Sequence, residues 1–217
     1  PDFVRRICEL RDAVRKDKEL SELIERKYRI KNVTGLTINP FIEFEDPFDI
    51  ILHLIVGSEG TLAFLAEATM RTVTDYPFKA SAMLYFPNMY AACQAVTKLK
   101  KSPVTAVEMF DRQAIRSVED KPNAIPELKT LPAEAAVLLI KTEADNEPAL
   151  KQYIDEVTAV ISKFDLLYPT RFTDKASEYN AYWTMRSGIF PTVGSTRPIG
   201  TTCLIEDVAF QVDDLPQ

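Results

Sequence analysis

The sequence predicts an α+β fold in two parts, with the boundary near Asp75–Phe78. In the first part, residues 2–28 repeat apolar side chains every three or four positions, which is the spacing of amphipathic helices. From Pro77 the pattern changes to short apolar strands that alternate with amphipathic helices, as two successive β-α-β-type units. Units of this size predict a ferredoxin-like layer, with helices packed on one face of a sheet.

The first part is expected to hold helices and one long strand. One or two helices cover residues 2–28, and the stretch 27–47 is loop-like because glycine and prolines interrupt it. A short helix is predicted over residues 48–54. Residues 61–73, "TLAFLAEATMRTV", alternate well enough to predict a long strand, with Phe64, Ala68 and Met70 on one of its faces.

The second part is expected to alternate strands and helices around a proline-marked loop at residues 120–132. Its strands are predicted at 79–87, 104–110, 133–143, 165–172 and 201–211, and its helices at 88–101, 111–118, 146–162 and 174–186.

Charge and hydropathy limit the partners that the chain can have. The 217 residues carry a formal net charge of −6, so no basic surface favours nucleic acid or anionic lipid. No apolar run approaches the ~20 residues that a membrane span needs, so membrane association is not indicated. The first twenty residues are charged and helical in pattern, which is unlike a signal peptide.

Cysteine and histidine are too sparse to predict a metal centre. Cys8, Cys93 and Cys203 lie far apart without CxxC spacing, which is typical of the reduced thiols of a cytoplasmic protein. The single histidine, His53, lies between two leucines and is interpreted as structural. A zinc site or a Ser/His/Asp triad within this chain is therefore poorly supported.

Glycine is scarce and clustered. Average usage predicts about 15 glycines in a chain of this length, yet the sequence has 6. Two lie in "GSEG", residues 57–60, and three lie between residues 186 and 200. Because glycine is needed for positive φ or for close backbone approach, each cluster predicts a special backbone site, with a simple turn as the alternative.

The second cluster also contains two arginines. Arg186 and Arg197 are eleven residues apart and joined by a segment with glycine and proline, which would let both converge on one carboxylate. The alternative is a pair of solvated arginines, one of them bound to Glu206 or Asp207.

Three motifs carry a resemblance to a known family. "LIVGSEGTLAFLAEATMRTV", residues 54–73, resembles the signature of the FAD-linked oxidases of the vanillyl-alcohol oxidase type. The segment 182–216, with "RSGIFPTVG" and "EDVAF", is similar to the substrate domain of the D-lactate and D-2-hydroxyglutarate dehydrogenase branch, above all its large bacterial members that carry an iron–sulfur region. "RKYRIKNVTGLTIN", residues 26–39, is also similar to the stretch that precedes the glycine motif in those proteins.

The resemblance implies a fold, a cofactor and a reaction. Residues 1–76 would be the C-terminal part of an FAD-binding domain, and residues 77–217 a partial ferredoxin-like substrate (cap) domain. The reaction would be hydride transfer from the α-carbon of a D-2-hydroxy acid to the flavin. Arg186 and Arg197 would hold the substrate carboxylate. The implied FAD contacts come from two segments: Lys31, Asn32, Gly35, Gly57, Ser58, Glu59, Gly60 and Thr61.

The resemblance also implies that each site is incomplete in this chain. The family's glycine-rich pyrophosphate loop would precede residue 1, and its metal ligands and catalytic base would follow Gln217. We therefore expect a piece of a larger protein, inactive alone, with any iron–sulfur cluster elsewhere in the parent. Its partners would be a small hydroxy acid, the remaining domains of the parent, and further copies of itself through exposed sheet edges. Ala63 and Ile205 stand where some relatives have glycine and lysine.

Two other functions remain open from the sequence. The chain could be a cofactor-free ferredoxin-like binding or assembly module, in which "GSEG" is a turn and the arginines are surface residues. It could instead belong to a flavin oxidase of sugars or phenols, although an arginine-rich substrate segment favours an acid.

Overall fold

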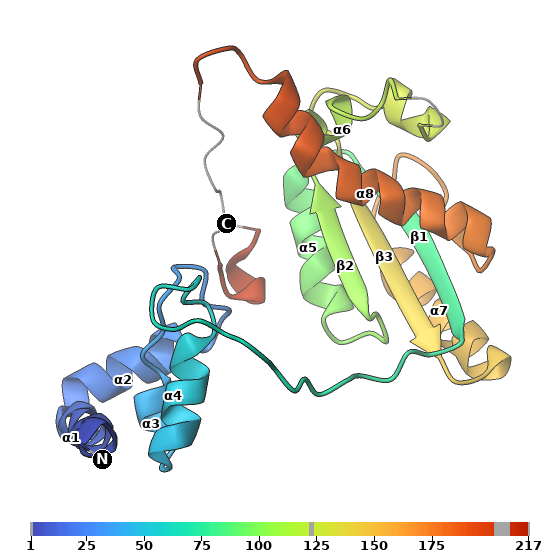
Figure 1. Ribbon diagram of the computed structural model, residues 1–217. Helices are drawn as coiled ribbons and strands as arrows, with labels where there is room; N and C mark the ends of the chain where they lie inside the picture. Colours follow the sequence, from blue (N-terminus) through green and yellow to red (C-terminus); the bar gives the residue numbers. More distant parts are fainter. Residues whose placement is uncertain (1, 122–123, 202–208, 217) are drawn as a thin grey trace. The chain divides into compact units, whose positions relative to one another are not determined.

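The computed structural model describes residues 2–121, 124–201 and 209–216 (Figure 1). The chain divides into two compact units, one that extends to Thr72 and one that begins at Val73. Each unit has its own hydrophobic core.

The first unit is helical. Its helices are α1 (Asp2–Lys16), α2 (Lys18–Lys27), α3 (Pro40–Glu43) and α4 (Pro47–Ile55). Ile7, Phe41 and Ile50 form the buried centre where α1, α3 and α4 meet. Aspartate side chains begin two of the helices, since Asp17 accepts from the Leu20 amide and Asp46 accepts from the Phe48 amide. The helices predicted at residues 2–28 and 48–54 are confirmed, and α3 adds one turn within the expected loop.

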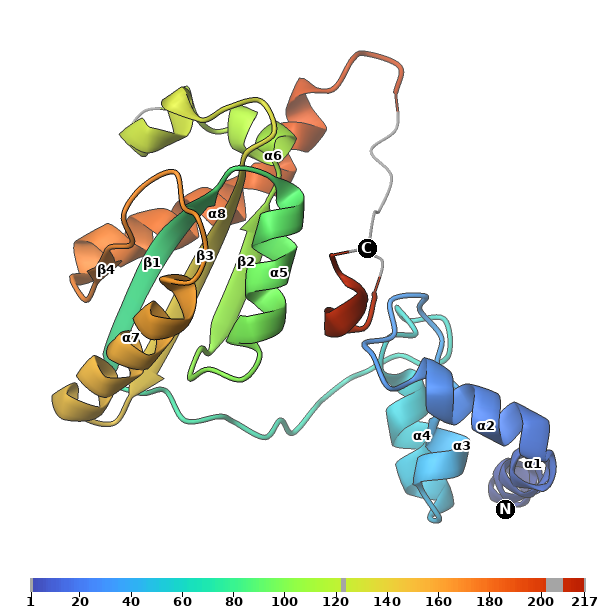
Figure 2. The ribbon, with the colours of Figure 1, turned by 180° about the vertical axis from the view of Figure 1, so that it is seen from behind.

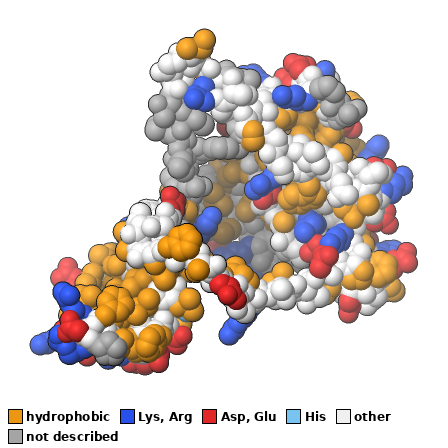
Figure 3. Space-filling view, in the orientation of Figure 1, with side chains coloured by type: hydrophobic (Ala, Val, Ile, Leu, Met, Phe, Trp, Pro, Cys, Tyr) orange, Lys and Arg blue, Asp and Glu red, His pale blue; other side chains and the backbone are white. Residues whose placement is uncertain are grey.

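The helical unit also leaves many apolar side chains in solvent. Figure 3 shows hydrophobic side chains gathered on the surface of this unit. Phe3, Phe48 and Val56 are among its exposed apolar residues, at 60%, 68% and 68%. Large exposed apolar patches are uncommon on proteins that act alone.

The long strand predicted at residues 61–73 is wrong for this structure. No strand is assigned there, and every residue from Phe64 to Phe78 is exposed. A β-strand needs a neighbour to accept and donate its backbone hydrogen bonds, and no described segment pairs with this one. Alternation alone therefore did not produce a strand here.

The second unit is built on one antiparallel sheet. Its strands are β1 (Phe78–Phe86), β2 (Ala106–Phe110), β3 (Ala136–Ala144) and β4 (Phe172–Thr173), in the order β2-β3-β1-β4. β3 pairs antiparallel with both β1 and β2, so β1 and β2 run parallel with β3 between them. This is the split β-α-β arrangement, and it confirms the predicted α+β, ferredoxin-like layer.

Helices cover both faces of the sheet. α5 (Met89–Leu99) and α7 (Glu147–Ile161) pack on one face, against a core that includes Leu84, Phe86 and Leu138 (Figure 2). α8 (Ala176–Thr196) crosses the opposite face (Figure 1), where its Trp183 packs near Leu139. The prediction of helices on one face is therefore wrong, because neighbouring residues of β1 and β3 point apolar side chains to opposite faces.

α8 also runs further than predicted. The sequence pattern ended this helix at residue 186, yet it continues to Thr196 through Gly188 and Pro191. Tertiary packing outweighs the helix-breaking residues, since Met185 and Ile189 bury against the sheet. The other predicted elements correspond to α6 (Arg112–Arg116) and a β4 of two residues, whereas the final strand predicted at 201–211 lies largely outside the described residues. Short 3₁₀ turns occupy Pro126–Thr130 and Val212–Asp214.

Candidate cofactor and substrate sites

The two segments predicted to contact FAD lie side by side in the helical unit. Gly35 and Gly57 both have positive φ, 91° and 80°. A Cβ atom built on Gly57 would lie 3.0 Å from the carbonyl oxygen of Gly35, which is closer than such atoms normally approach. Glycine is therefore required at position 57 twice over, by its φ angle and by the neighbouring backbone.

Hydrogen bonds hold each segment in shape. The Asn32 side-chain amide donates to the Gly35 carbonyl at 3.1 Å, and Asn32 Oδ1 accepts from the Thr34 amide at 3.2 Å. In the second segment, the amide and the hydroxyl of Thr61 both donate to the Ser58 carbonyl, at 2.9 and 2.6 Å. The two loops are thus ordered by their own contacts.

The glycine turn presents its middle at the surface. Ser58 is buried, only 3% exposed, whereas Glu59 and Gly60 are exposed and both have positive φ. Lys31, on the other segment, is also exposed. Exposed turns of successive left-handed residues can direct backbone N–H groups toward an anion.

A pocket of about 330 Å³ lies between the two segments. Asn32, Gly35 and Gly57 line it, together with His53 of α4. His53 stacks on Phe44 with ring centroids 4.0 Å apart, and its Nδ1 lies 2.7 Å from the Asp49 carbonyl. These contacts support the structural interpretation of the histidine. Of the predicted FAD contacts, Asn32, Gly35 and Gly57 line this pocket, and Glu43 adds a carboxylate to its lining. The glycines, the amide groups and the size fit an uncharged part of FAD, such as its ribose or ring system, rather than its pyrophosphate.

The structure does not bring Arg186 and Arg197 together. Arg186 lies within α8, and Arg197 follows the end of that helix, so eleven helical rises separate them by about 16 Å along the axis. Arg186 Nη2 donates to both carboxylate oxygens of Glu108, at 3.1 and 3.3 Å. Arg197 instead donates to backbone carbonyls, from its Nε to that of Thr201 at 2.9 Å and from its Nη1 to that of Gly194. In this arrangement one small carboxylate cannot reach both guanidinium groups.

Glu108 is a partner that sequence reasoning missed. The alternative partners considered for the arginines, Glu206 and Asp207, lie outside the described residues. Glu108 shares the α8-covered face with Phe110, because residues two apart on a strand point the same way. The alternation along the strand could have placed Glu108 on this face, but only the position of α8 shows that Arg186 reaches the Glu108 carboxylate.

Polar groups continue along the same face of the sheet. The indole Nε1 of Trp183 donates to Ser81 Oγ at 3.0 Å, and Lys141 Nζ lies 5.8 Å from the centroid of the Trp183 ring. Lys141 also forms an ion pair with Glu143 at 2.8 Å. Positive and negative side chains are therefore balanced beside Arg186, whose side chain is 46% exposed.

A small pocket of about 130 Å³ opens on this face of the sheet as well. Tyr85, Tyr168 and Tyr182 line it, with Arg171 and Glu127 as its charged groups. Burial raises the pKa of the Tyr85 hydroxyl far above its usual range, and the charge of Glu127 adds to this effect. Burial raises the pKa of Tyr182 also. Both hydroxyls therefore remain protonated hydrogen-bond donors at neutral pH.

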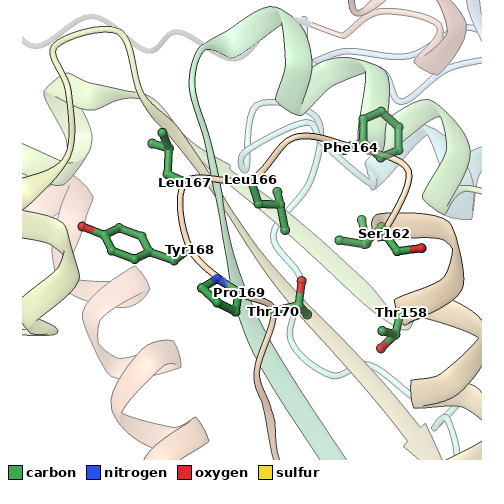
Figure 4. Close-up of a pocket in the computed structure, with 9 residues that line it drawn as sticks. Thr158, Ser162, Phe164, Leu166, Leu167, Tyr168, Pro169 and Thr170 are labelled. Atoms are coloured by element: carbon green, nitrogen blue, oxygen red, sulfur yellow. The ribbon is translucent and has the colours of Figure 1, made fainter.

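A third pocket, of about 440 Å³, lies at the end of α7 beside the loop that leads to β4 (Figure 4). The side chains that line it, from Thr158 to Thr170, are uncharged, so it offers no cation to an acid substrate.

The described residues hold neither a metal centre nor a membrane-spanning helix. Residues 2–121, 124–201 and 209–216 contain no group of three or more His, Cys, Asp or Glu side chains placed to hold a metal ion. None of the helices in those ranges combines the length and the apolar character needed to cross a membrane.

Comparison with known proteins gives one family. Residues 77–217 match the family described as FAD linked oxidases, C-terminal domain. The chain is 34% identical over 88 residues to a D-lactate dehydrogenase of Archaeoglobus fulgidus, which is 40% of this chain and 19% of that protein. It is 30% identical over 119 residues to the glycolate oxidase subunit GlcD of Bacillus subtilis, 53% of this chain and 24% of the relative.

A eukaryotic relative shows the same partial coverage. The mitochondrial D-lactate dehydrogenase [cytochrome] of Kluyveromyces lactis is 23% identical over 146 residues, 66% of this chain and 25% of the relative. The matched region is thus about a fifth to a quarter of the length of these three relatives.

Proposed function

Because the chain belongs to the FAD-linked oxidases through their C-terminal domain, we propose that it serves an FAD-dependent enzyme that oxidises a D-2-hydroxy acid. The names of the relatives support this substrate class, since lactate and glycolate are both 2-hydroxy acids. In this proposal residues 1–76 complete an FAD-binding domain and residues 77–217 contribute to the substrate domain. An iron–sulfur region elsewhere in the parent stays a prediction.

The observation that carries the proposal is the meeting of the 31–35 and 57–61 segments beside one pocket, which Asn32, Gly35 and Gly57 line. Two glycines with positive φ lie there within van der Waals reach of each other, although the sequence has only 6 glycines. Lys31, Asn32, Glu59 and Gly60 would contact the cofactor from these loops, with Gly35, Gly57, Ser58 and Thr61 holding the loops in place. When bound, the flavin supplies a hydride acceptor.

Arg186 would position the substrate by its carboxylate. Its present partner, Glu108, is 35% exposed, and exposed ion pairs of this kind contribute only about 0–1 kcal/mol. A substrate carboxylate can therefore replace Glu108 at the guanidinium at little cost. This contact orients the substrate and leaves the chemistry to groups that touch the reacting carbon.

Arg197 and the catalytic base are assigned separately from Arg186. Arg197 would reach substrate only if its bonds to the carbonyls of Gly194 and Thr201 were exchanged. We assign no catalytic base to this chain, and expect it from the remainder of the parent protein.

The test is the visible spectrum of the flavin-loaded parent protein, recorded without air before and after substrate is added. D-lactate, glycolate and D-2-hydroxyglutarate are the substrates, and propionate, which has the carboxylate but no hydroxyl, is the matched control. Bleaching by a hydroxy acid and not by propionate is expected. A parent without flavin, or one bleached only by phenols or sugars, would contradict the proposal.

A further inference from the structure

A small pocket on the α8-covered face of the sheet holds polar groups that the proposed flavin chemistry does not use. The pocket has a volume of about 130 Å³ and lies wholly within the sheet unit, since the residues that line it run from Met83 to Tyr182. Its walls come from β1, α8, the 3₁₀ turn at 126–130 and the loop before β4. Arg186 and Glu108 are not among the lining residues, so this pocket is separate from the proposed substrate contact.

One lining residue is a buried tyrosine whose hydroxyl has no partner among the described residues. Tyr85 is only 6% exposed, and no hydrogen bond joins its hydroxyl, or that of Tyr182, to another described residue. By contrast, the Tyr168 hydroxyl lies 2.6 Å from Thr130 Oγ1, and its ring packs edge-on against Tyr85 with centroids 5.2 Å apart. A buried hydroxyl without a hydrogen bond costs free energy, so an open hydroxyl in a formed pocket indicates a ligand with polar atoms.

Two opposite charges line the same pocket without pairing with each other. Glu127 is half-buried and Arg171 is exposed, and neither forms an ion pair with a described residue. Burial raises the pKa of Tyr85 and of Tyr182, and the charge of Glu127 adds to both shifts, so its carboxylate lies near both hydroxyls. An anion and a cation that line one pocket but stay apart leave room for a molecule of the complementary charges between them.

These groups limit the ligand to a small zwitterion. An anion alone would be repelled by Glu127, and a cation alone by Arg171. An α-amino acid carries an ammonium group with three N–H donors and a carboxylate that accepts, so it complements both charges and the two open hydroxyls. The pocket volume equals roughly four water molecules at about 30 Å³ each, which suits glycine or alanine and excludes a large side chain.

We propose that this pocket binds a small α-amino acid, with its ammonium group at Glu127 and its carboxylate at Arg171. The hydroxyls of Tyr85 and Tyr182 accept from the ammonium group or donate to the carboxylate. The tyrosine rings exclude water from one side of the ligand, which strengthens both charged contacts. The site does not depend on the proposed flavin chemistry, and an amino acid bound there undergoes no reaction.

The first test is isothermal titration calorimetry of the flavin-loaded parent protein with glycine and with L-alanine. An amino acid shares its carboxylate with a hydroxy acid, so each titration is repeated in Arg186→Met. Binding is expected in both proteins, and binding that is lost in Arg186→Met would assign the amino acid to the substrate site and overturn the proposal. The controls are ethylamine and propionate, which carry only one of the two charges and should bind Arg186→Met about tenfold more weakly or worse. Equal affinity for either control would overturn the zwitterion as the ligand.

A second test removes one group of the pocket at a time in the Arg186→Met protein. Glu127→Gln and Arg171→Gln keep the size of the side chain and remove its charge, and each should raise the dissociation constant about tenfold or more. Tyr85→Phe removes only the hydroxyl and should raise it about threefold or more.

Matched controls make the same charge changes at exposed positions away from the pocket. Glu134→Gln and Arg116→Gln should leave the dissociation constant unchanged. A parent protein that binds neither amino acid would overturn the proposal. So would Glu127→Gln and Arg171→Gln that bind the amino acid as tightly as these controls do.

Discussion

The close approach of Gly57 to Gly35 predicts that alanine is more destabilising at Gly57 than at Gly60, although both glycines belong to one turn. Gly57 and Gly60 have nearly equal φ, 80° and 77°, but an added Cβ meets the Gly35 carbonyl at 3.0 Å in one case and open space in the other. An alanine in the left-handed region costs about 1–2 kcal/mol at either position. The steric conflict at Gly57 should add about 1–3 kcal/mol, as overpacking does elsewhere.

The comparison is made by urea unfolding of Gly57→Ala and Gly60→Ala. Far-UV circular dichroism reports the helices of both units, whereas Trp183 fluorescence reports the sheet unit alone, because the only tryptophan packs against β1 and β3. A circular dichroism transition without a matching fluorescence transition is therefore the unfolding of the helical unit. The free energy of unfolding of the helical unit should fall more in Gly57→Ala than in Gly60→Ala. The fluorescence transition of both variants should stay near that of the wild type. Equal losses from the two variants would refute the steric argument.

The same contact has a consequence for the proposed cofactor. Gly57→Val adds a branched side chain where the loops meet, and we expect it to lower the flavin content of the purified parent protein. The measurement is the ratio of flavin to protein absorbance, with Gly188→Ala of α8 as control, because a Cβ there meets open space. Full flavin loading in Gly57→Val would mean that "GSEG" is only a turn.

Three further predictions concern the sheet unit. Arg186→Met in the parent should raise KM for a hydroxy acid at least tenfold while flavin is retained. The control Arg116→Met changes another exposed arginine and should leave KM unchanged. An unchanged KM in Arg186→Met would show that Arg186 does not bind the substrate. Trp183→Phe deletes the hydrogen bond to Ser81 and should lower the free energy of unfolding by about 1 kcal/mol, measured by urea denaturation, with Ser81→Ala as a comparison of similar size. Burial raises the pKa of Tyr85 above its unfolded value, so the folded state holds its proton longer and stability should fall as pH rises above about 10. Tyr85→Phe should reduce that slope in unfolding experiments at alkaline pH, and an unaltered slope would count against the assignment.

Local pattern was sufficient to predict most strands and helices of the sheet unit and the helices at residues 2–28 and 48–54. Helices at residues 88–101 and 146–162 appear as α5 and α7, and the strands at 79–87 and 133–143 appear as β1 and β3. These elements follow from apolar periods of 3.6 and 2 residues, which any segment of the chain carries by itself. Of the clustered glycines, Gly57, Gly60 and Gly200 have positive φ, whereas Gly188 and Gly194 lie within α8.

The predictions of the 61–73 strand and of the end of α8 were wrong because each depends on a segment that is distant along the chain. The alternation of residues 61–73 specifies a strand, but a strand forms only where a neighbour supplies its hydrogen bonds. The glycines and proline near the end of α8 predict a loop, but packing on the sheet holds the helix through them.

The sequence by itself determined the α+β class, the order of the elements from β1 to α8, and the positive φ of the "GSEG" turn, because these depend on residues that are close along the chain. Only the tertiary structure decided that Gly35 faces Gly57, that Glu108 binds Arg186, and that Arg186 and Arg197 stand apart. Each of these depends on groups whose separation in space is set by the packing of whole elements, which no local pattern specifies.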